Sequence, residues 1–383
     1  MFSFATTREI LNGAGSSLAM AERVSAVLGR RILLVTDPGL TALGLVAPVV
    51  AHLEAHGLAV LVFDGVSADP PEADVLAGLD AALAHHATGI LGLGGGSPMD
   101  VAKAIALLAG SGQPLDDAYG VGKAIGPRLP LALVPTTAGT GSEVTPIAIL
   151  TTSLAEKRGI VSPLLLPDVA VLDAELTLGL PPMITAATGI DAMVHAIEAY
   201  ASASPNNNPL SRMLAREALR LLSTSIRIAC QDGGNRDARE KMLLGSMLAG
   251  QAFANSPVAA VHALAYPIGS HFHVPHGLSN ALVLPHVLRF NLPAGENAYA
   301  QIAADAFPAL SRLPPPERAA RFADSLAALS RELGLPQRLR DIGIGEADLP
   351  LLARDAMKQE RLLVNNPRSL DERDALTIYR AAW

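Results

Sequence analysis

The feature that most constrains the fold is a change of hydrophobic pattern near residue 180. Before it, short apolar runs alternate with longer segments rich in Ala and Leu; the runs include RILLVTD, LAVLVF, TGILGLGGG, PLALVPTT and DVAVLD. Runs of this kind predict buried strands, and the segments between them predict helices. Strands that alternate with helices predict a parallel sheet with right-handed crossovers.

Beyond Pro182 the pattern is helical almost throughout, as in MLAREALRLLSTSIRIAC and RAARFADSLAALSRELG. A chain of 383 residues is also too long for one ordinary domain. The sequence therefore predicts an α/β domain with a parallel sheet over residues 1–180 and an all-α domain over residues 181–383.

Composition narrows the class of partner. The formal net charge is -7, and the lysines and arginines are scattered, so nucleic acid or an anionic membrane is not expected as a partner. Cys230 is the single cysteine, which excludes an intramolecular disulfide and suits the cytoplasm. Charged Arg8 and Glu9 interrupt the N-terminal segment before a signal-peptide core can form, and no uncharged apolar run reaches membrane-spanning length. A small-molecule partner is the expectation.

Three consecutive glycines mark the first candidate ligand site. Gly94, Gly95 and Gly96 follow the run TGILGL and precede a helical segment. Glycine lets backbone amides approach a ligand closely, and a helix N-terminus favours an anion such as a pyrophosphate. Ser97 is expected as the helix cap and Pro98 as its first residue. The spacing is not GxGxxG, and a tight turn that binds nothing is the alternative.

The segment PTTAGTGSEVT is a second transition from strand to loop. Its hydroxyl groups could bind phosphate or ribose oxygens; they belong to Thr136, Thr137, Thr140, Ser142 and Thr145. The alternative is a loop that satisfies its own backbone. Because both loops follow strands of one parallel sheet, we expect them at the edge where open α/β sheets bind ligands.

Asp37 closes the run RILLVTD. A carboxylate at this position can accept hydrogen bonds from an adenosine ribose and repel a 2'-phosphate. Ordinary turn chemistry before Pro38 and Gly39 is an equally good explanation.

Asp191 and His195 lie four residues apart in the helical segment TGIDAMVHAIEAY, so they share one helix face. Such a pair is more often a helix-stabilising contact than a metal site. However, HALAYPIGSHFHVPHGLSNALVLPH holds five of the ten histidines: His262, His271, His273, His276 and His286. Prolines and glycines break this segment, so His262 and His276 can converge from separate elements. Imidazoles with one carboxylate suit a first-row divalent metal, with iron and zinc as the leading candidates.

Four of these segments together resemble the iron-containing (group III) alcohol dehydrogenases: GGGSPMDVAKAIA, PTTAGTGSEVT, TAATGIDAMVHAIEAY and HALAYPIGSHFHVPHG. The likeness extends over nearly the whole chain. It implies a Rossmann-like N-terminal domain, a helical C-terminal domain and an active site in the cleft between them. It also implies a metal ion, Fe(II) first and Zn(II) as the alternative, bound by Asp191, His195, His262 and His276.

The resemblance further implies NAD as the cofactor. The glycine loop, which comprises Gly94, Gly95, Gly96, Ser97, Pro98 and Asp100, would hold the pyrophosphate. The threonine loop, with Thr136, Thr137, Thr140, Ser142 and Thr145, would lie along the phosphates and the nicotinamide ribose. Asp37 would favour NAD over NADP, and Lys157 occupies the place of a lysine near the cofactor.

Two positions depart from the family pattern. Many members have a histidine near the substrate where this chain has Tyr266, so proton relay could run through Tyr266, His271, or water and the ribose hydroxyls. Asp69 stands where the family often has asparagine near the cofactor.

The resulting expectation is metal-assisted hydride transfer between a small alcohol or aldehyde and NAD(H), in a homo-oligomer. A maleylacetate reductase-like or glycerol dehydrogenase-like activity is the alternative within the same superfamily. A non-catalytic filament or scaffold protein ranks last, because it predicts damaged motifs and all are intact here.

Overall fold

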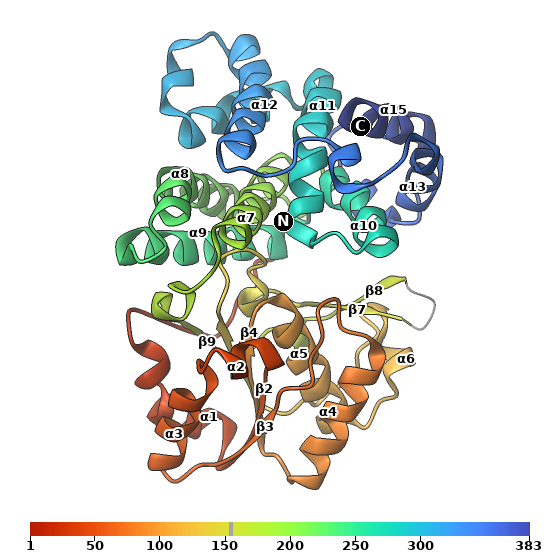
Figure 1. Ribbon diagram of the computed structural model, residues 1–383. Helices are drawn as coiled ribbons and strands as arrows, with labels where there is room; N and C mark the ends of the chain where they lie inside the picture. The colour runs from red at the N-terminus through yellow and green to blue at the C-terminus, as the bar shows by residue number, and fades with distance from the viewer. Residues whose placement is uncertain (153–155) are drawn as a thin grey trace. The chain divides into compact units, whose positions relative to one another are not determined.

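The computed structural model describes residues 1–152 and 156–383, which form two compact units (Figure 1). The sheet unit comprises Ala5–Leu178 and contains all the described strands. The helical unit comprises Gly179–Trp383 together with Met1–Phe4. The first residues belong to the helical unit because the backbone N and O of Ser3 each bond the Asn206 side chain at 2.9 Å.

A six-stranded parallel sheet forms the centre of the sheet unit, which confirms the predicted fold class. In spatial order its strands are β1 (Glu9–Asn12), β9 (Val169–Leu172), β6 (Leu131–Pro135), β4 (Gly89–Gly94), β2 (Arg31–Val35) and β3 (Ala59–Phe63). The chain continues from β2 to β3 on one side and from β4 to β6 on the other. The carboxyl ends of β2 and β4 therefore flank the point where the strand order reverses, the usual ligand site of open α/β sheets.

Helices cover both faces of this sheet (Figure 1). One face packs against α1 (Ala21–Leu28) and α3 (Val46–Ala55), and the other against α4 (Glu72–Ala84) and α5 (Gly96–Ser111). Side chains alternate along β2, so Ile32 and Leu34 enter the first core and Leu33 and Val35 enter the second. Burial on both faces explains why the central strands are continuous apolar runs rather than alternating ones.

The edges of the sheet differ from the sequence expectations. The run LAVLVF predicts a buried strand. The strand is present as β3, but the prediction that it is buried is wrong, because Leu61 and Val62 are each 37% exposed. The reason is that β3 pairs with β2 alone and forms one edge of the sheet. β1, which forms the other edge by pairing with β9, was not predicted.

A second, three-stranded sheet was also not predicted. It consists of β5 (Gly120–Val121), β8 (Lys157–Val161) and β7 (Ile147–Thr151), with β7 and β8 antiparallel. Two short helices complete the sheet unit, α2 (Pro38–Ala42) and α6 (Leu115–Ala118).

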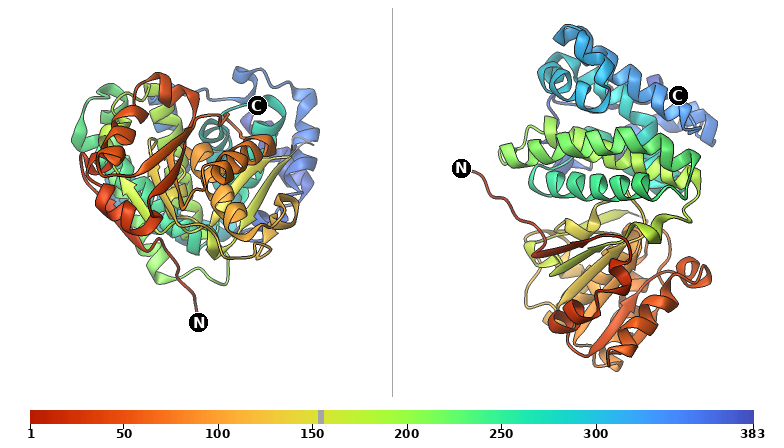
Figure 2. Two further views of the ribbon diagram at one scale, coloured as in Figure 1. Left: turned by 90° about the horizontal axis from the view of Figure 1, so that it is seen from below. Right: turned by 90° about the vertical axis from the view of Figure 1, so that its left-hand side faces the viewer.

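The helical unit begins with α7 at Pro182, where the sequence pattern changes. Its helices are α7 (Pro182–Ala201), α8 (Pro209–Gln231), α9 (Arg236–Asn255), α10 (Ala260–Phe272), α11 (His276–Ala306), α12 (Pro315–Glu332), α13 (Leu349–Ala356), α14 (Glu360–Leu363) and α15 (Glu372–Ala382). The green helices α8 and α9 lie side by side and contact α7 (Figure 2). Every α7 residue from Gly189 to Tyr200 is buried, so α7 is the central helix of this unit. Among the described residues, no helix is both long and apolar enough to cross a membrane.

Candidate metal centre and cofactor loops

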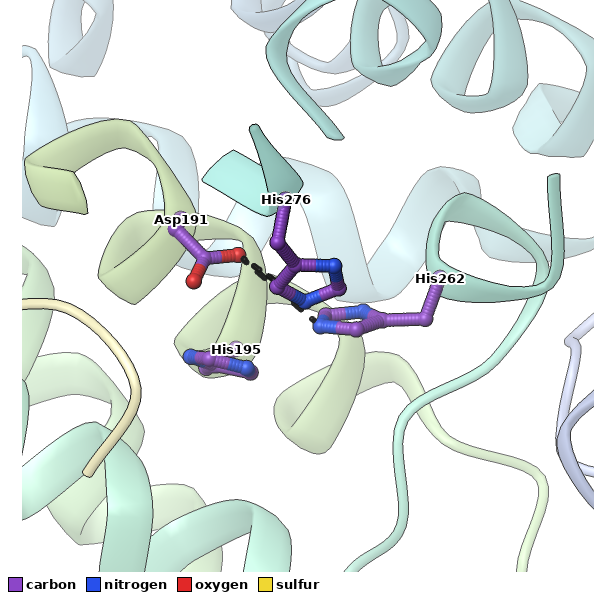
Figure 3. A group of neighbouring side chains, drawn as sticks. All are labelled: Asp191, His195, His262 and His276. Atoms are coloured by element: carbon purple, nitrogen blue, oxygen red, sulfur yellow. Dashed lines mark ion pairs between the residues drawn. The ribbon is translucent and has the colours of Figure 1, made fainter. Parts of the chain in front are cut away.

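Four predicted ligands come together in the helical unit (Figure 3). Asp191 and His195 lie one turn apart on α7, His262 lies in the first turn of α10, and His276 begins α11. One potential ligand atom from each side chain lies within 4.8 Å of those of the other three. The break between α10 and α11 turns His276 back towards His262; within it, His273 adopts a left-handed backbone with φ of 53°.

The donor set fits a small divalent ion. Asp191 Oδ1 lies 3.9 Å from Nε2 of His262 and 3.8 Å from Nε2 of His276. Bonds of about 2.0–2.2 Å to four tetrahedral ligands place the ligand atoms roughly 3.3–3.6 Å apart, so small side-chain shifts suffice. Burial opposes ionisation of Asp191, but the three imidazoles and the Asn280 amide outweigh it and hold the pKa of Asp191 below its ordinary value. The carboxylate is therefore available as an anionic ligand.

Two buried side chains that the sequence analysis missed surround these ligands. Glu198 Oε2 lies 2.6 Å from Nδ1 of His262, and Asn280 Nδ2 donates to Asp191 Oδ1 at 2.6 Å. A helical spacing could have revealed both: Glu198 follows His195 by three residues, and Asn280 follows His276 by four. The predicted ligands His262 and Asp191 thus have hydrogen-bond partners of their own.

The two side chains named as candidates for proton relay, Tyr266 and His271, have different surroundings. Tyr266 lies one turn after His262 on α10, and its ring centroid is 5.7 Å from that of His276. His271, the other named candidate for proton relay, is exposed, and its Nε2 pairs with Asp355 Oδ2 at 2.7 Å.

The glycine loop lies at the carboxyl end of β4, as predicted, but its helix begins earlier than expected. α5 begins at Gly96 with Gly95 as its cap, so the prediction of Ser97 as cap and Pro98 as first residue is wrong. The helix starts earlier because Gly95 already has the extended backbone of a cap residue, with φ of -74° and ψ of -163°. The amides of Gly96 and Ser97 then belong to the first helical turn, where no carbonyl within the helix can accept from them. A Cβ added at Gly94 would lie 2.6 Å from Pro98 Cγ, so only glycine fits there.

The threonine loop lies beside the glycine loop. Thr136 N donates to the carbonyl of Gly94 at 2.9 Å. A Cβ added at Gly96 would meet Thr140 Cγ2 at 2.9 Å. The two loops that the sequence placed at one edge of the sheet are therefore in contact.

Asp100, Ser142 and Thr145, which are predicted cofactor residues, belong to one hydrogen-bond network inside the sheet unit. Ser142 Oγ donates to Asp100 Oδ1 at 2.6 Å. The ammonium of Lys103, whose side chain is 0% exposed, donates to Ser142 Oγ at 2.7 Å, to Thr145 Oγ1 at 3.1 Å and to the Ile147 carbonyl at 2.7 Å. Lys103 therefore joins α5 to the threonine loop. It was missed, although it follows Asp100 by three residues within the quoted glycine motif.

Burial shifts the pKa values of two ionisable side chains here, Lys103 and the neighbouring Glu143. Burial lowers the pKa of Lys103 to about 8, although nearby Asp100 and Glu143 favour its charge. Burial also raises the pKa of Glu143 to about 7, and its buried Oε1 has no hydrogen-bond partner among residues 1–152 and 156–383.

Asp37 and Lys157 each have a partner within the protein. Asp37 follows β2 and caps α2, because its Oδ1 accepts from the amide of Leu40 at 3.0 Å. Lys157 forms an ion pair with Asp69, the residue that departs from the family pattern. Asp37 therefore stabilises the turn after β2, and Asp69 balances the charge of Lys157.

Comparison with known proteins agrees with this arrangement. The family model described as iron-containing alcohol dehydrogenase matches residues 7–174, and the model of the C-terminal part of the Fe-containing alcohol dehydrogenase family matches residues 185–383. The 1,3-propanediol dehydrogenase of Citrobacter freundii is 39% identical over 386 residues, which cover 100% of this chain and 99% of the relative. Long-chain-alcohol dehydrogenase 1 of Geobacillus thermodenitrificans is 41% identical over 383 residues, which cover 97% and 94%.

Solved structures give the same result. A crystal structure of 1,3-propanediol oxidoreductase superposes with a TM-score of 0.96 at 37% identity, covering 100% of both chains. Sulfoacetaldehyde reductase from Bifidobacterium kashiwanohense, in complex with NAD+, superposes with a TM-score of 0.89 at 30% identity, covering 100% of this chain and 98% of that one. The two family models together span most of the sequence, and the boundary between the sheet unit and the helical unit falls between the residues that they match. The chain belongs to the iron-containing alcohol dehydrogenase family.

Proposed function

We propose that this chain is an NAD-dependent dehydrogenase of small alcohols and aldehydes that holds a divalent metal, Fe(II) first, on Asp191, His195, His262 and His276. The observation that carries the proposal is the convergence of these four donors from three helices within 4.8 Å. When bound, the ion supplies a Lewis acid that lowers the pKa of an alcohol or polarises an aldehyde. NAD supplies the hydride acceptor at C4 of its nicotinamide.

The four proposed ligands determine the net charge of the metal centre. Because Asp191 is the one carboxylate among the four ligands, it offsets half of a divalent charge and leaves a positive field for the substrate oxygen. His195 and His262 are buried, and the ring of His195 stacks on Phe253 with a centroid distance of 4.4 Å. These contacts fix the ligands and limit the access of water.

We assign the cofactor to the glycine loop, which follows β4 at the strand-order reversal, and to the neighbouring threonine loop, which follows β6. The amides of Gly96 and Ser97 are available to bind the pyrophosphate, and the hydroxyls of Thr137 and Thr140 are the candidates for phosphate and ribose oxygens. The family relative solved with NAD+ supports the choice of nicotinamide cofactor. Asp100, Ser142 and Thr145 would act by shaping the loop, since Lys103 engages them.

Tyr266 is assigned to the wall of the substrate pocket. Its ring lies next to that of the ligand His276. We assign proton transfer to water and the ribose hydroxyls rather than to Tyr266.

Metal content and cofactor use test this function. The protein as isolated should contain about one divalent ion per chain and should convert a panel of short alcohols with NAD+. Removal of the ion with a chelator should abolish turnover, and Fe(II) or Zn(II) should restore it. Full turnover by metal-free protein would contradict the proposal.

Replacing Asp37 separates its two roles. Asp37→Asn keeps an acceptor for the Leu40 amide but removes the charge, so the preference for NAD+ over NADP+ should fall about tenfold, chiefly in KM. Asp37→Ala removes the cap as well and serves as the comparison. An unchanged cofactor ratio in Asp37→Asn would reduce Asp37 to a turn residue.

A further inference from the structure

We propose that Glu198 is a positioning residue for the metal centre, which fixes His262 in the one tautomer whose Nε2 can bind the ion. The inference rests on the proposed metal-dependent function. Glu198 lies on α7 and is only 6% exposed. Each of its carboxylate oxygens contacts a residue of α10. Oε2 lies 2.6 Å from Nδ1 of His262, and Oε1 accepts from the amide of Val261 at 2.7 Å.

The chemistry of the two groups determines the tautomer. A neutral imidazole carries one hydrogen, on Nδ1 or on Nε2, and a carboxylate can only accept. A contact of 2.6 Å between Glu198 and Nδ1 therefore requires the hydrogen on Nδ1 of His262. Nε2 is left with a lone pair, and Nε2 is the atom that faces Asp191.

The surroundings of Nε2 point to the same tautomer independently. Asn280 Nδ2, which donates to Asp191 Oδ1 at 2.6 Å, also lies 3.4 Å from Nε2 of His262 and 3.2 Å from Nε2 of His276. A donor next to Nε2 is favourable when Nε2 carries no hydrogen. The reversed amide would set its oxygen against the Asp191 carboxylate, so this orientation of Asn280 is the favourable one.

Glu198 also anchors the backbone that carries His262. Val261 is in the first turn of α10, where backbone amides have no acceptor within the helix. One carboxylate thus caps this helix and holds the imidazole of the next residue. Because α7 also carries Asp191 and His195, Glu198 fixes the His262 ring relative to two other ligands.

Glu198→Gln is the informative substitution because it keeps the size of the side chain but replaces one of the two acceptor oxygens with a donor NH2 group. Glutamine offers one oxygen and one NH2 group, whereas its partners, Val261 N–H and His262 Nδ1–H, are both donors. If the NH2 faces His262, the ring hydrogen moves to Nε2 and blocks the ion. If the oxygen faces His262, the NH2 opposes the Val261 amide and displaces the start of α10. We expect Zn(II) affinity to fall about 10- to 100-fold.

The experiment measures Zn(II) binding to the metal-depleted full chain by competition with a chromophoric chelator. Asp305→Asn is the matched control: it removes another buried carboxylate of the helical unit, ion-paired with Arg216 near the far end of α11 from His276. Its Zn(II) affinity should stay within about threefold of wild type. Equal losses in the two variants would indicate general destabilisation and overturn the proposal.

A second readout reports the tautomer directly. Long-range 1H–15N NMR spectra of the metal-depleted wild type should show His262 with its hydrogen on Nδ1, and Glu198→Gln should change that pattern or the ring position. A hydrogen on Nε2 in the wild type would overturn the proposal even if the variant fails to fold. Unchanged affinity in Glu198→Gln with a wild type that binds Zn(II) tightly would also overturn it, whereas a wild type that binds no metal would remove the proposed function itself.

Discussion

His276→Ala should remove most of the bound metal and nearly all dehydrogenase activity while leaving the helical unit folded. The His276 side chain is 38% exposed, whereas those of Asp191 and His262 are 2% and 3% exposed. Truncating it therefore deletes a ligand without opening a cavity in the core. Loss of an outer hydrogen-bond partner already weakens metal binding about 10- to 100-fold, so loss of a ligand should exceed that range.

The measurements are elemental analysis and turnover with NAD+, with circular dichroism to check folding. His273→Asn is the control, because asparagine tolerates the left-handed backbone at this exposed position three residues upstream. It should keep its metal and most of its turnover. Stoichiometric metal with near-normal turnover in His276→Ala would remove His276 from the ligand set.

Lys103→Met should lower the free energy of unfolding by about 3–5 kcal/mol, the usual effect of breaking a buried ion pair by removing one partner. The ammonium of Lys103 is fully buried and lies 3.8 Å from Asp100 Oδ1. Without it, the Ile147 carbonyl loses a donor and the Asp100 carboxylate loses its nearest cation. Urea unfolding of the full chain at pH 7 measures the change.

A double variant separates this charge effect from a packing effect. Asp100→Asn removes the carboxylate that Lys103 balances, so Lys103→Met with Asp100→Asn should be less destabilised than the sum of the two single changes. Zn(II) affinity should remain that of the wild type in all three, since the proposed metal ligands lie in the helical unit. Additive effects, or a loss below about 1 kcal/mol for Lys103→Met, would show that the ion pair contributes little.

Local sequence signals account for most of the fold and for the inner part of the site. The central strands were predictable because burial on both faces makes them continuous apolar runs, as in ILLV of β2. A helical repeat places Asp191 and His195 on one face, and the Pro- and Gly-broken segment allows His262 and His276 to converge, but the complete set of four was implied by the family resemblance. Two strands carry weak sequence signals and were missed. β1 has the polar residues Glu9 and Asn12 at its ends, and β8 begins with Lys157 and Arg158.

The partners of the site depend on contacts between distant segments. Glu198 meets His262 across 64 residues, and Asn280 meets Asp191 across 89 residues. Lys103 reaches Ser142 across 39 residues and donates hydrogen bonds to the Ser142 and Thr145 hydroxyls, which the sequence alone could not separate from those of Thr137 and Thr140. Sequence periodicity indicates which residues share one face of a helix, but it does not indicate which faces pack together. The contacts of Glu198, Asn280 and Lys103 could therefore be found only from the structure.

The pairing of β1 with β9 has a consequence for how the chain is made on the ribosome. Where these two strands end, the amide of Gly15 bonds Asp173, a residue 158 positions later. At a synthesis rate of about 5–20 residues per second, β1 leaves the ribosome roughly 8–30 s before its partner exists. For that interval the backbone of β1, which includes Ile10 and Leu11, has no partner strand, and an unpaired strand can pair with other chains. The sheet can assemble from β2, β3 and β4 first, and it acquires its earliest-made strand last.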